Sequence, residues 1–179
     1  MTRNYQQAQY AAGFKKGYSI LLQATKKYLS ENETFYPEGT SSWNRAWQTD
    51  FNQYVKSTKI ENVNYESNNY KTYNGKISPV WNNGGVRWQL ASGETFQLDV
   101  WLYEQTRIWY DLNGKKGPNR LGFDIFIFVL DDEKGAVPLG APGFYVTGDC
   151  KVNSSAGNRN GTQCAYKAAT DPNYFKNLP

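Results

Sequence analysis

The stretch Tyr110-Asp-Leu-Asn-Gly-Lys-Lys-Gly-Pro-Asn-Arg-Leu-Gly-Phe-Asp-Ile-Phe-Ile-Phe128 joins a polar, glycine-rich segment to an unbroken apolar run. Its three glycines and Pro118 predict a loop of fixed shape, because glycine reaches backbone angles that other residues avoid and proline restricts its own. Strands are expected on both sides, at Thr106–Tyr110 and Phe123–Leu130. The loop is therefore expected to connect two neighbouring strands of a sheet.

The same loop is a candidate calcium site. Its side-chain oxygens, together with backbone carbonyls, would supply most of the six to eight oxygens that Ca²⁺ takes. Lys115 falls where an EF-hand loop offers its third side-chain ligand, and Lys116 adds a second positive charge. The alternative is that Asp and Asn cap the turns and that Asp124 ties the loop to its strand. The candidate ligands are Asp111, Asn113, Asn119 and Asp124.

The sequence around the loop predicts an antiparallel sheet. Val86–Leu90 and Thr95–Val100 are separated by the four residues 91–94, a length typical of a hairpin. The run Phe123–Leu130 does not alternate between polar and apolar residues after Asp124. We therefore expect this last strand to be covered on both faces.

Two helices are expected before the sheet. Residues 3–29 carry apolar residues at the spacing of one helix face, and most of their lysines lie off that stripe. A second, shorter helix is expected from a Ser/Thr cap at 40–42 to about Ser57. The apolar stripe of the first helix comprises Tyr10, Phe14, Tyr18, Leu21, Leu22, Tyr28 and Leu29.

The rest of the chain is less regular. Residues 58–84 are rich in Asn, Tyr, Ser and Gly and read as an irregular connection with a short strand at Tyr70–Tyr73. Asp131 and Asp132, with Glu133 and Lys134, read as a solvated turn. Further short strands are expected at Phe144–Thr147 and Cys164–Ala168.

Helices followed by strands predict an α+β fold, in which a long N-terminal helix packs on an antiparallel sheet. The length of 179 residues predicts a single domain. Its expected parts are the N-terminal helix (3–29), a variable connecting region containing the second short helix (30–84), the sheet (85–130) and a C-terminal disulfide-loop region (131–179).

Composition argues against several classes of function. The chain contains no histidine, which excludes Ser-His-Asp and Cys-His catalysis and His-ligated metals. The formal net charge of +4 is spread along the chain without a block of like charges, so nothing demands a nucleic-acid or membrane partner. We expect a protein that is not an enzyme, although a pair of carboxylates meeting across a cleft stays possible on sequence alone.

Cys150 and Cys164 lie 14 residues apart in a segment rich in Gly, Asn and Ser. Two thiols without other good ligands do not make a zinc site. We expect a disulfide, and with it an oxidising compartment. Two unpaired thiols in the cytosol are the alternative. A disulfide requires export to an oxidising compartment, but the sequence shows no export signal. We therefore expect that the natural N-terminal segment is missing before Met1.

The chain holds 14 Tyr, 9 Phe and 6 Trp, more than the core of such a domain usually needs. One interpretation is an aromatic platform for sugars or single-stranded nucleic acid, with Arg87 and Arg107 nearby. The other is that aromatic residues alternating along strands form the core and cross-strand pairs. The candidate binding residues are Trp81, Trp88, Trp101 and Trp109.

Three segments together resemble a known family. They are the helix at 4–24, the segment Leu-Ala-Ser-Gly-Glu-Thr-Phe at 90–96, and the strand–loop–strand motif at 108–128. In these the chain is similar to type IV pilin-like proteins of Gram-negative bacteria, a group that includes the type II secretion pseudopilins. The likeness covers 4–29 and 85–130, and a C-terminal cysteine pair is also common in the family. Residues 30–84 lie outside it.

The resemblance implies a structural subunit of a type IV pilus-like or type II secretion filament. In the family a peptidase removes a short leader, and an apolar helix of about 25 residues precedes the polar continuation. The implied partners are other pilin subunits and the assembly machinery. The implied location is the inner membrane and periplasm, then a filament. Some pseudopilins also bind calcium in this region of the sheet. A secreted binding module for carbohydrate or nucleic acid is the alternative function.

Overall fold

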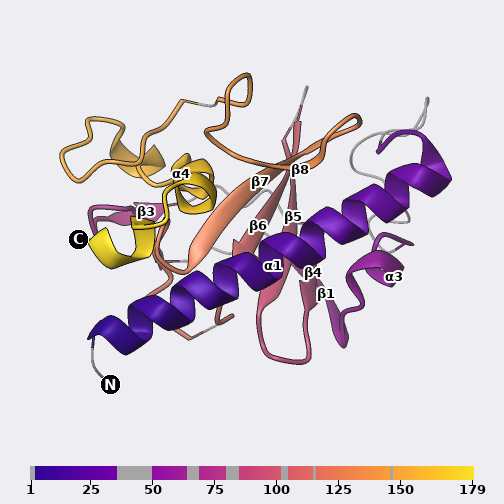
Figure 1. The fold of residues 1–179 in the computed structure, drawn as a ribbon, viewed down its shortest axis with the longest axis horizontal. Coiled ribbons are helices and arrows are strands. Elements are labelled where there is room, and N and C mark those ends of the chain that lie inside the picture. The colour runs from indigo at the N-terminus through magenta and orange to yellow at the C-terminus, as the bar shows by residue number, and fades with distance from the viewer. Residues whose placement is uncertain are drawn as a thin grey trace.

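The computed structural model describes residues 3–35, 50–63, 69–79, 85–101, 105–114, 116–145 and 147–179. They form the expected α+β fold: one long helix lies diagonally across a twisted antiparallel sheet, and the C-terminal segment packs beside the helix (Figure 1). In the described part of the chain, no helix combines the length and apolar character needed to cross a membrane.

Helix α1 spans Arg3–Asn32 and confirms the predicted N-terminal helix. It runs three residues beyond the expected end, where the Asn32 side chain donates to the carbonyl of Tyr28 at 3.0 Å. The helix stops before Glu33, whose φ of 49° lies in the left-handed region. One stripe of α1 is buried, because its small and apolar residues recur at helical spacing. The buried residues are Tyr10, Phe14, Gly17, Leu21, Ala24, Thr25 and Tyr28.

Among the described residues, six strands form the main sheet, in the order β1-β4-β5-β6-β7-β8, and every neighbouring pair is antiparallel. The strands β2 and β3 form a separate hairpin. The strand bounds are β1 Lys59–Val63, β2 Asn69–Lys71, β3 Ile77–Pro79, β4 Gly85–Gln89, β5 Thr95–Trp101, β6 Gln105–Asp111, β7 Ile125–Asp131 and β8 Gly135–Pro138.

One face of the sheet is closed by α1, and we call it the closed face. The ring of Phe14 packs on that of Phe126 at 4.6 Å between centroids. Gly17 lies so close to Tyr110 that an added Cβ would stand 1.9 Å from the ring. The Tyr110 hydroxyl donates to the carbonyl of Gly13 at 2.9 Å, which fixes the helix on the sheet. Cross-strand neighbours Trp88, Phe96, Tyr110 and Phe126 form the centre of this core.

The opposite face of the sheet, which we call the open face, carries a smaller apolar cluster. It consists of Leu121, Ile125, Ile127, Val129 and Leu139. Because β7 contributes buried residues to both faces, the prediction that the run Phe123–Leu130 is covered on both sides is confirmed. Strands β1, β4 and β5 present polar side chains to the open face, among them Glu61, Arg87 and Gln97.

Several predicted boundaries differ from the structure. The expected strand at Cys164–Ala168 is wrong, because this segment belongs to the helix α4, Cys164–Thr170. Its alanines favour a helix, and its small face packs Cys164 and Ala165 into the core. Phe144 and Tyr145 lie in no strand, and Val146 is outside the described residues.

The connecting region also holds more structure than expected. Strand β1 lies within the segment expected to be irregular, and β2 covers only the start of the strand expected at Tyr70–Tyr73. The helix α3, Asn52–Val55, is the described end of the expected second helix, whose start lies outside the described residues. The expected turn at 131–134 is confirmed, and it leads into the unexpected edge strand β8.

Candidate functional site

Of the loop residues that the structure describes between β6 and β7, three lie in the left-handed region: Gly114 (φ 64°), Asn119 (φ 49°) and Gly122 (φ 77°). Glycine is needed at Gly122 for a second reason, since an added Cβ would lie 2.6 Å from the sulfur of Cys164. The loop is thus a fixed structure held against the C-terminal segment. This agrees with the prediction of a shaped turn.

Asp124 is the centre of this loop and is fully buried. Its carboxylate accepts hydrogen bonds from the backbone N–H groups of Asn119 at 2.9 Å and Arg120 at 2.6 Å. The side-chain amide of Asn113 donates to it at 3.3 Å. Burial raises the pKa of Asp124, while these three donors oppose the rise. Asp124 therefore closes the loop, as its expected structural role requires.

Asp111 stands at the end of β6, where it accepts a hydrogen bond from the backbone N–H of Asn113 at 3.0 Å. Burial raises the pKa of Asp111 to about 8, and the nearby negative charge of Asp124 adds to the rise. A buried carboxyl group, Asp124, and a partly exposed one, Asp111, thus share one loop, and ionisation of Asp124 makes ionisation of Asp111 more costly.

All four expected calcium ligands are gathered in this loop. The oxygens Asn113 Oδ1 and Asn119 Oδ1 are buried and accept no hydrogen bond from the protein. A hard cation would satisfy these two oxygens and would favour the ionised form of both carboxyl groups. The loop residues therefore fit Ca²⁺ in the kind of donor they present. Within the described part of the chain, however, no group of three or more Asp, Glu, His or Cys side chains could hold a metal.

The two cysteines form a disulfide, with their Cα atoms 5.1 Å apart. Both are buried against the core of the closed face. The Tyr174 hydroxyl lies 3.8 Å from the Cys150 sulfur and donates to the carbonyl of Gly122 at 2.7 Å. The disulfide thus closes a loop within the C-terminal segment, and Tyr174 links that segment to the loop that holds Asp124.

The two candidate tryptophans whose side chains the structure describes, Trp88 and Trp109, lie on opposite faces of the sheet. Trp88 is completely buried in the closed face, which agrees with the alternative interpretation as a core residue. Trp109 lies half-buried on the open face, where it packs against Tyr70. Trp81 and the side chain of Trp101 lie outside the described residues.

A groove of about 910 Å³ lies on the open face, beside Trp109 and next to the loop. In Figure 1 the helix α1 crosses in front of the sheet, so this groove is turned away from the viewer. Its lining comes from the separate hairpin, from five strands of the sheet, from the β4–β5 turn and from the loop: Lys59, Glu61, Tyr70, Arg87, Gln89, Ser92, Gly93, Thr95, Gln97, Trp109, Asp111, Leu112, Asn113, Gly114, Lys116, Asn119 and Ile125.

Sequence reasoning missed most of this groove. The alternation of Lys59 and Glu61 with Ile60 is the signal of a half-buried strand, and the same alternation continues through Arg87 and Gln89 around Trp88. These polar positions point to the face opposite the core. Only pairing of β1 with β4 brings them together, and the sequence alone does not give that pairing.

No family model, no curated protein and no solved structure matches this chain.

Proposed function

We propose that this chain is the head and the adjoining part of the long helix of a filament subunit, of the type IV pilus-like or type II secretion kind. The observation that supports the proposal is the placement of α1. One helix of 30 residues lies across one face of an antiparallel sheet, where α3 and the C-terminal segment join the same core, and its buried stripe begins only at Tyr10. The first two turns project beyond that stripe, toward the edge of the molecule (Figure 1).

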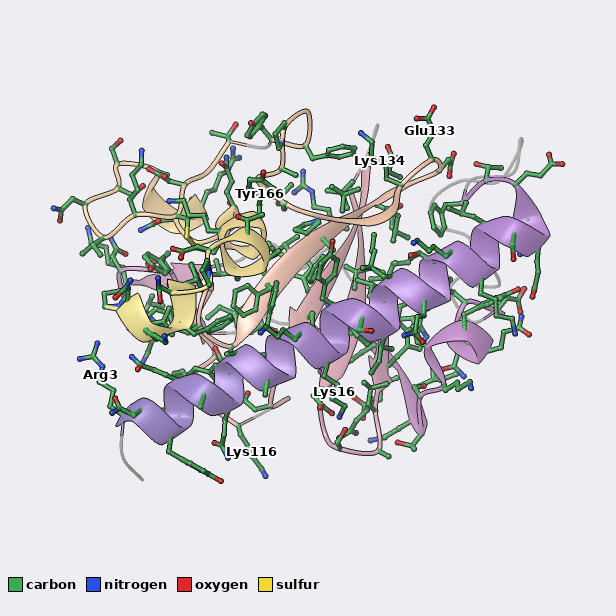
Figure 2. The ribbon with its side chains drawn as sticks, viewed as in Figure 1. Arg3, Lys16, Lys116, Glu133, Lys134 and Tyr166 are labelled. Carbon is green, nitrogen blue, oxygen red and sulfur yellow. A yellow bond between two sulfur atoms is a disulfide. The ribbon has the colours of Figure 1, made fainter. Side chains whose placement is uncertain are left out.

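The projecting end of α1 is fixed rather than loose. Arg3 donates to the carbonyl of Leu178 at 2.6 Å, and Gln7 donates to the carbonyl of Lys176 at 3.3 Å. Figure 2 places Arg3 beside the C-terminal turn. A helical segment preceding Arg3 would continue away from the sheet along a direction that the head holds constant. This is the geometry that a subunit needs when its helix packs in a filament and its head faces outward.

In this role the partners are other subunits and the assembly machinery. The subunit would be anchored in the inner membrane of a Gram-negative bacterium before it joins the filament. The disulfide fits an oxidising compartment such as the periplasm. The loop 111–124 would also take Ca²⁺, a proposal supported by the orphaned amide oxygens of Asn113 and Asn119.

The test is the natural gene and its product in the source cell. We expect an upstream segment with a Gly-Phe-Thr-Leu-Ile-Glu-like leader junction and an apolar helix, and we expect the protein in filaments sheared from the cell surface or assembled in the periplasm. A cleavable signal peptide followed by release of a free monomer would refute the proposal.

Cysteine labelling gives a sharper readout of the packing. Ala12 lies on the exposed side of α1, and Tyr145 is 60% exposed on the head. In Ala12→Cys, a maleimide should label the isolated domain and be blocked in assembled filaments. In the control Tyr145→Cys, labelling should be equal in both. Equal labelling of both variants in filaments would contradict packing through α1.

A further inference from the structure

Two polar rows cross the open face at right angles to the strands. They follow from the register, because residues paired across antiparallel strands lie side by side on one face. The first row is Glu61, Arg87, Gln97 and Trp109, and the second row is Lys59, Gln89, Thr95 and Asp111. Both rows line the groove, so its floor is a regular array rather than a chance depression.

The first row contains a fixed planar group of hydrogen-bonding atoms. Arg87 donates from Nε and Nη2 to the amide oxygen of Gln97, at 3.2 and 2.9 Å. This double contact holds the guanidinium and the amide in one orientation. Gln97 is also 94% buried, so its position depends on the sheet and not on solvent. The pair is preorganised to bond vicinal hydroxyl groups.

An aromatic wall stands beside this planar pair. The ring of Tyr70, from the separate hairpin, lies 6.2 Å from that of Trp109, and the two planes differ by 22°. Flat aromatic faces beside planar polar side chains suit the two kinds of surface of a pyranose ring. Its C–H face packs on an aromatic ring, and its equatorial hydroxyls bond to amides and guanidinium groups.

The charges in the groove favour an uncharged ligand. Lys59 and Glu61 form an ion pair with each other. Arg87 is close enough to Asp111 to stabilise its negative charge. Among the lining residues that the structure describes, the remaining cation is the exposed side chain of Lys116. A polyanion such as single-stranded nucleic acid needs several cations along its backbone.

We propose that the groove binds a neutral oligosaccharide laid across β1, β4, β5 and β6. Neighbouring strands lie about 4.8 Å apart, close to the length of one pyranose unit in an extended chain, so that successive sugars would meet successive strands. The volume of about 910 Å³ suits several such units. This binding site goes beyond the role as a filament subunit and does not depend on it.

The experiment titrates the 179-residue domain with cellohexaose, chitohexaose, maltohexaose and mannohexaose, using calorimetry. We expect at least one of them to bind with a Kd below about 1 mM. In Trp109→Ala and in Arg87→Ala the affinity should fall at least tenfold. The control Tyr145→Ala removes an exposed aromatic residue outside the groove and should bind normally. Circular dichroism establishes that each variant is folded.

If Trp109→Ala fails to fold, the sugar affinities of Trp109→Phe and Arg87→Ala are compared with that of the control instead. Binding of none of the four sugars, or equal binding by Arg87→Ala and the control, would overturn the proposal. So would salt-sensitive binding of oligo(dT) that needs Trp109, because it would assign the groove to nucleic acid. Sedimentation tests whether a second copy of the chain covers this face instead. Dimers of the natural protein that dissociate in Arg87→Ala would assign the face to a second copy and would also overturn the sugar-binding proposal.

Discussion

The closed and open faces of the sheet are built by the same strands, yet they differ in almost every physical property. The closed face is a continuous aromatic core under α1, and its central residues are fully buried. The open face combines a small apolar cluster over β7 with polar rows over β1, β4, β5 and β6. Side chains alternate between the faces along each strand, so a single substitution tests one face at a time. The comparison separates residues that hold the fold from residues that line the groove.

The two tryptophans provide the strongest test of this difference. Trp88→Ala removes a fully buried ring from the closed face, and we expect it to cost about 3–5 kcal/mol of unfolding free energy. Trp109→Ala removes a half-buried ring from the open face and should cost about 1–2 kcal/mol of unfolding free energy. Chemical denaturation of both variants measures the two values. Equal losses would remove the distinction between the faces.

Two glycines test how closely α1 approaches the closed face. In Gly17→Ala the new Cβ would overlap the ring of Tyr110, which is buried and hydrogen-bonded, so we expect a loss of about 3 kcal/mol. Gly13→Ala is the matched control, because its Cβ would lie 3.6 Å from Leu112, an ordinary contact. This change should stabilise the protein by up to about 1 kcal/mol through helix propensity. A stabilised Gly17→Ala protein would show that α1 is not held at this distance.

Removal of the disulfide tests how much the C-terminal segment contributes to the stability of the closed face. Its cysteines are 14 residues apart, and replacing both by alanine should cost about 3 kcal/mol in the chain-entropy account. Reduction with dithiothreitol should lower the melting temperature of the natural sequence and leave the double variant unchanged. A natural protein that melts at the same temperature with and without dithiothreitol would show that this constraint is unimportant.

Asp111, at the border of the open face, predicts an unusual dependence on pH. Its folded pKa of about 8 lies above the ordinary value of about 4, so the folded state retains a proton that the unfolded state releases. Stability from this group is therefore complete below about pH 4 and falls by about 1.4 kcal/mol per pH unit as the pH rises toward 8. Asp124, whose pKa is also raised, acts in the same direction.

Melting temperatures of the natural chain and of Asp111→Asn, measured between pH 5 and pH 8, test this statement. The decline with rising pH should be smaller in the variant. Excess calcium should restore stability at pH 8 but much less at pH 5, because the ion needs ionised carboxylates, and it should have little effect on Asp111→Asn. No response to calcium at pH 8 would remove the metal from the loop and leave its structural role.

The smallest effect is expected at the rim, where the β4–β5 hairpin meets α1. Lys16 pairs with Glu94 at 2.6 Å, and its side chain is 47% exposed. Burial opposes ionisation of Glu94, but hydrogen bonds from Lys16 and Ser92 hold its pKa below the ordinary value. Lys16→Met should therefore cost less than about 1 kcal/mol. The contribution should be present above about pH 4 and be lost as the pH falls through the lowered pKa. A double-mutant cycle with Glu94→Gln measures the coupling energy between Lys16 and Glu94, and a coupling near zero would refute the predicted contribution.

Much of the closed face could be predicted from the sequence, because its signals are local. The apolar stripe from Tyr10 to Tyr28 has the period of a helix, and the apolar run in β7 requires cover on both sides. The secondary-structure predictions fail where the contact that decides the structure joins residues far apart in the sequence. Strand β8 is short and is held by Thr25, whose hydroxyl accepts from the backbone N–H of Ala136 at 3.1 Å. No residue within 135–138 indicates that Thr25 is the partner of this strand.

The candidate sites show the same division. The residues of the loop 111–124 could be chosen by type, and they do meet, because they are close in sequence and joined by a tight turn. The groove could not be predicted, since Glu61, Arg87 and Trp109 come together only through strand order and register. The sequence places Trp88 and Trp109 in strands, but only their registers separate one as core and the other as surface.

The attachment of α1 has a mechanical consequence. The helix is fastened along its length, by Arg3 to Leu178, by the carbonyl of Gly13 to Tyr110 and by Thr25 to Ala136. A force applied along the helix axis would load all of these bonds and the aromatic contacts between them together, in shear. A force across the axis would load one end first and peel the helix away. The head is therefore expected to withstand tension that is transmitted lengthwise through α1.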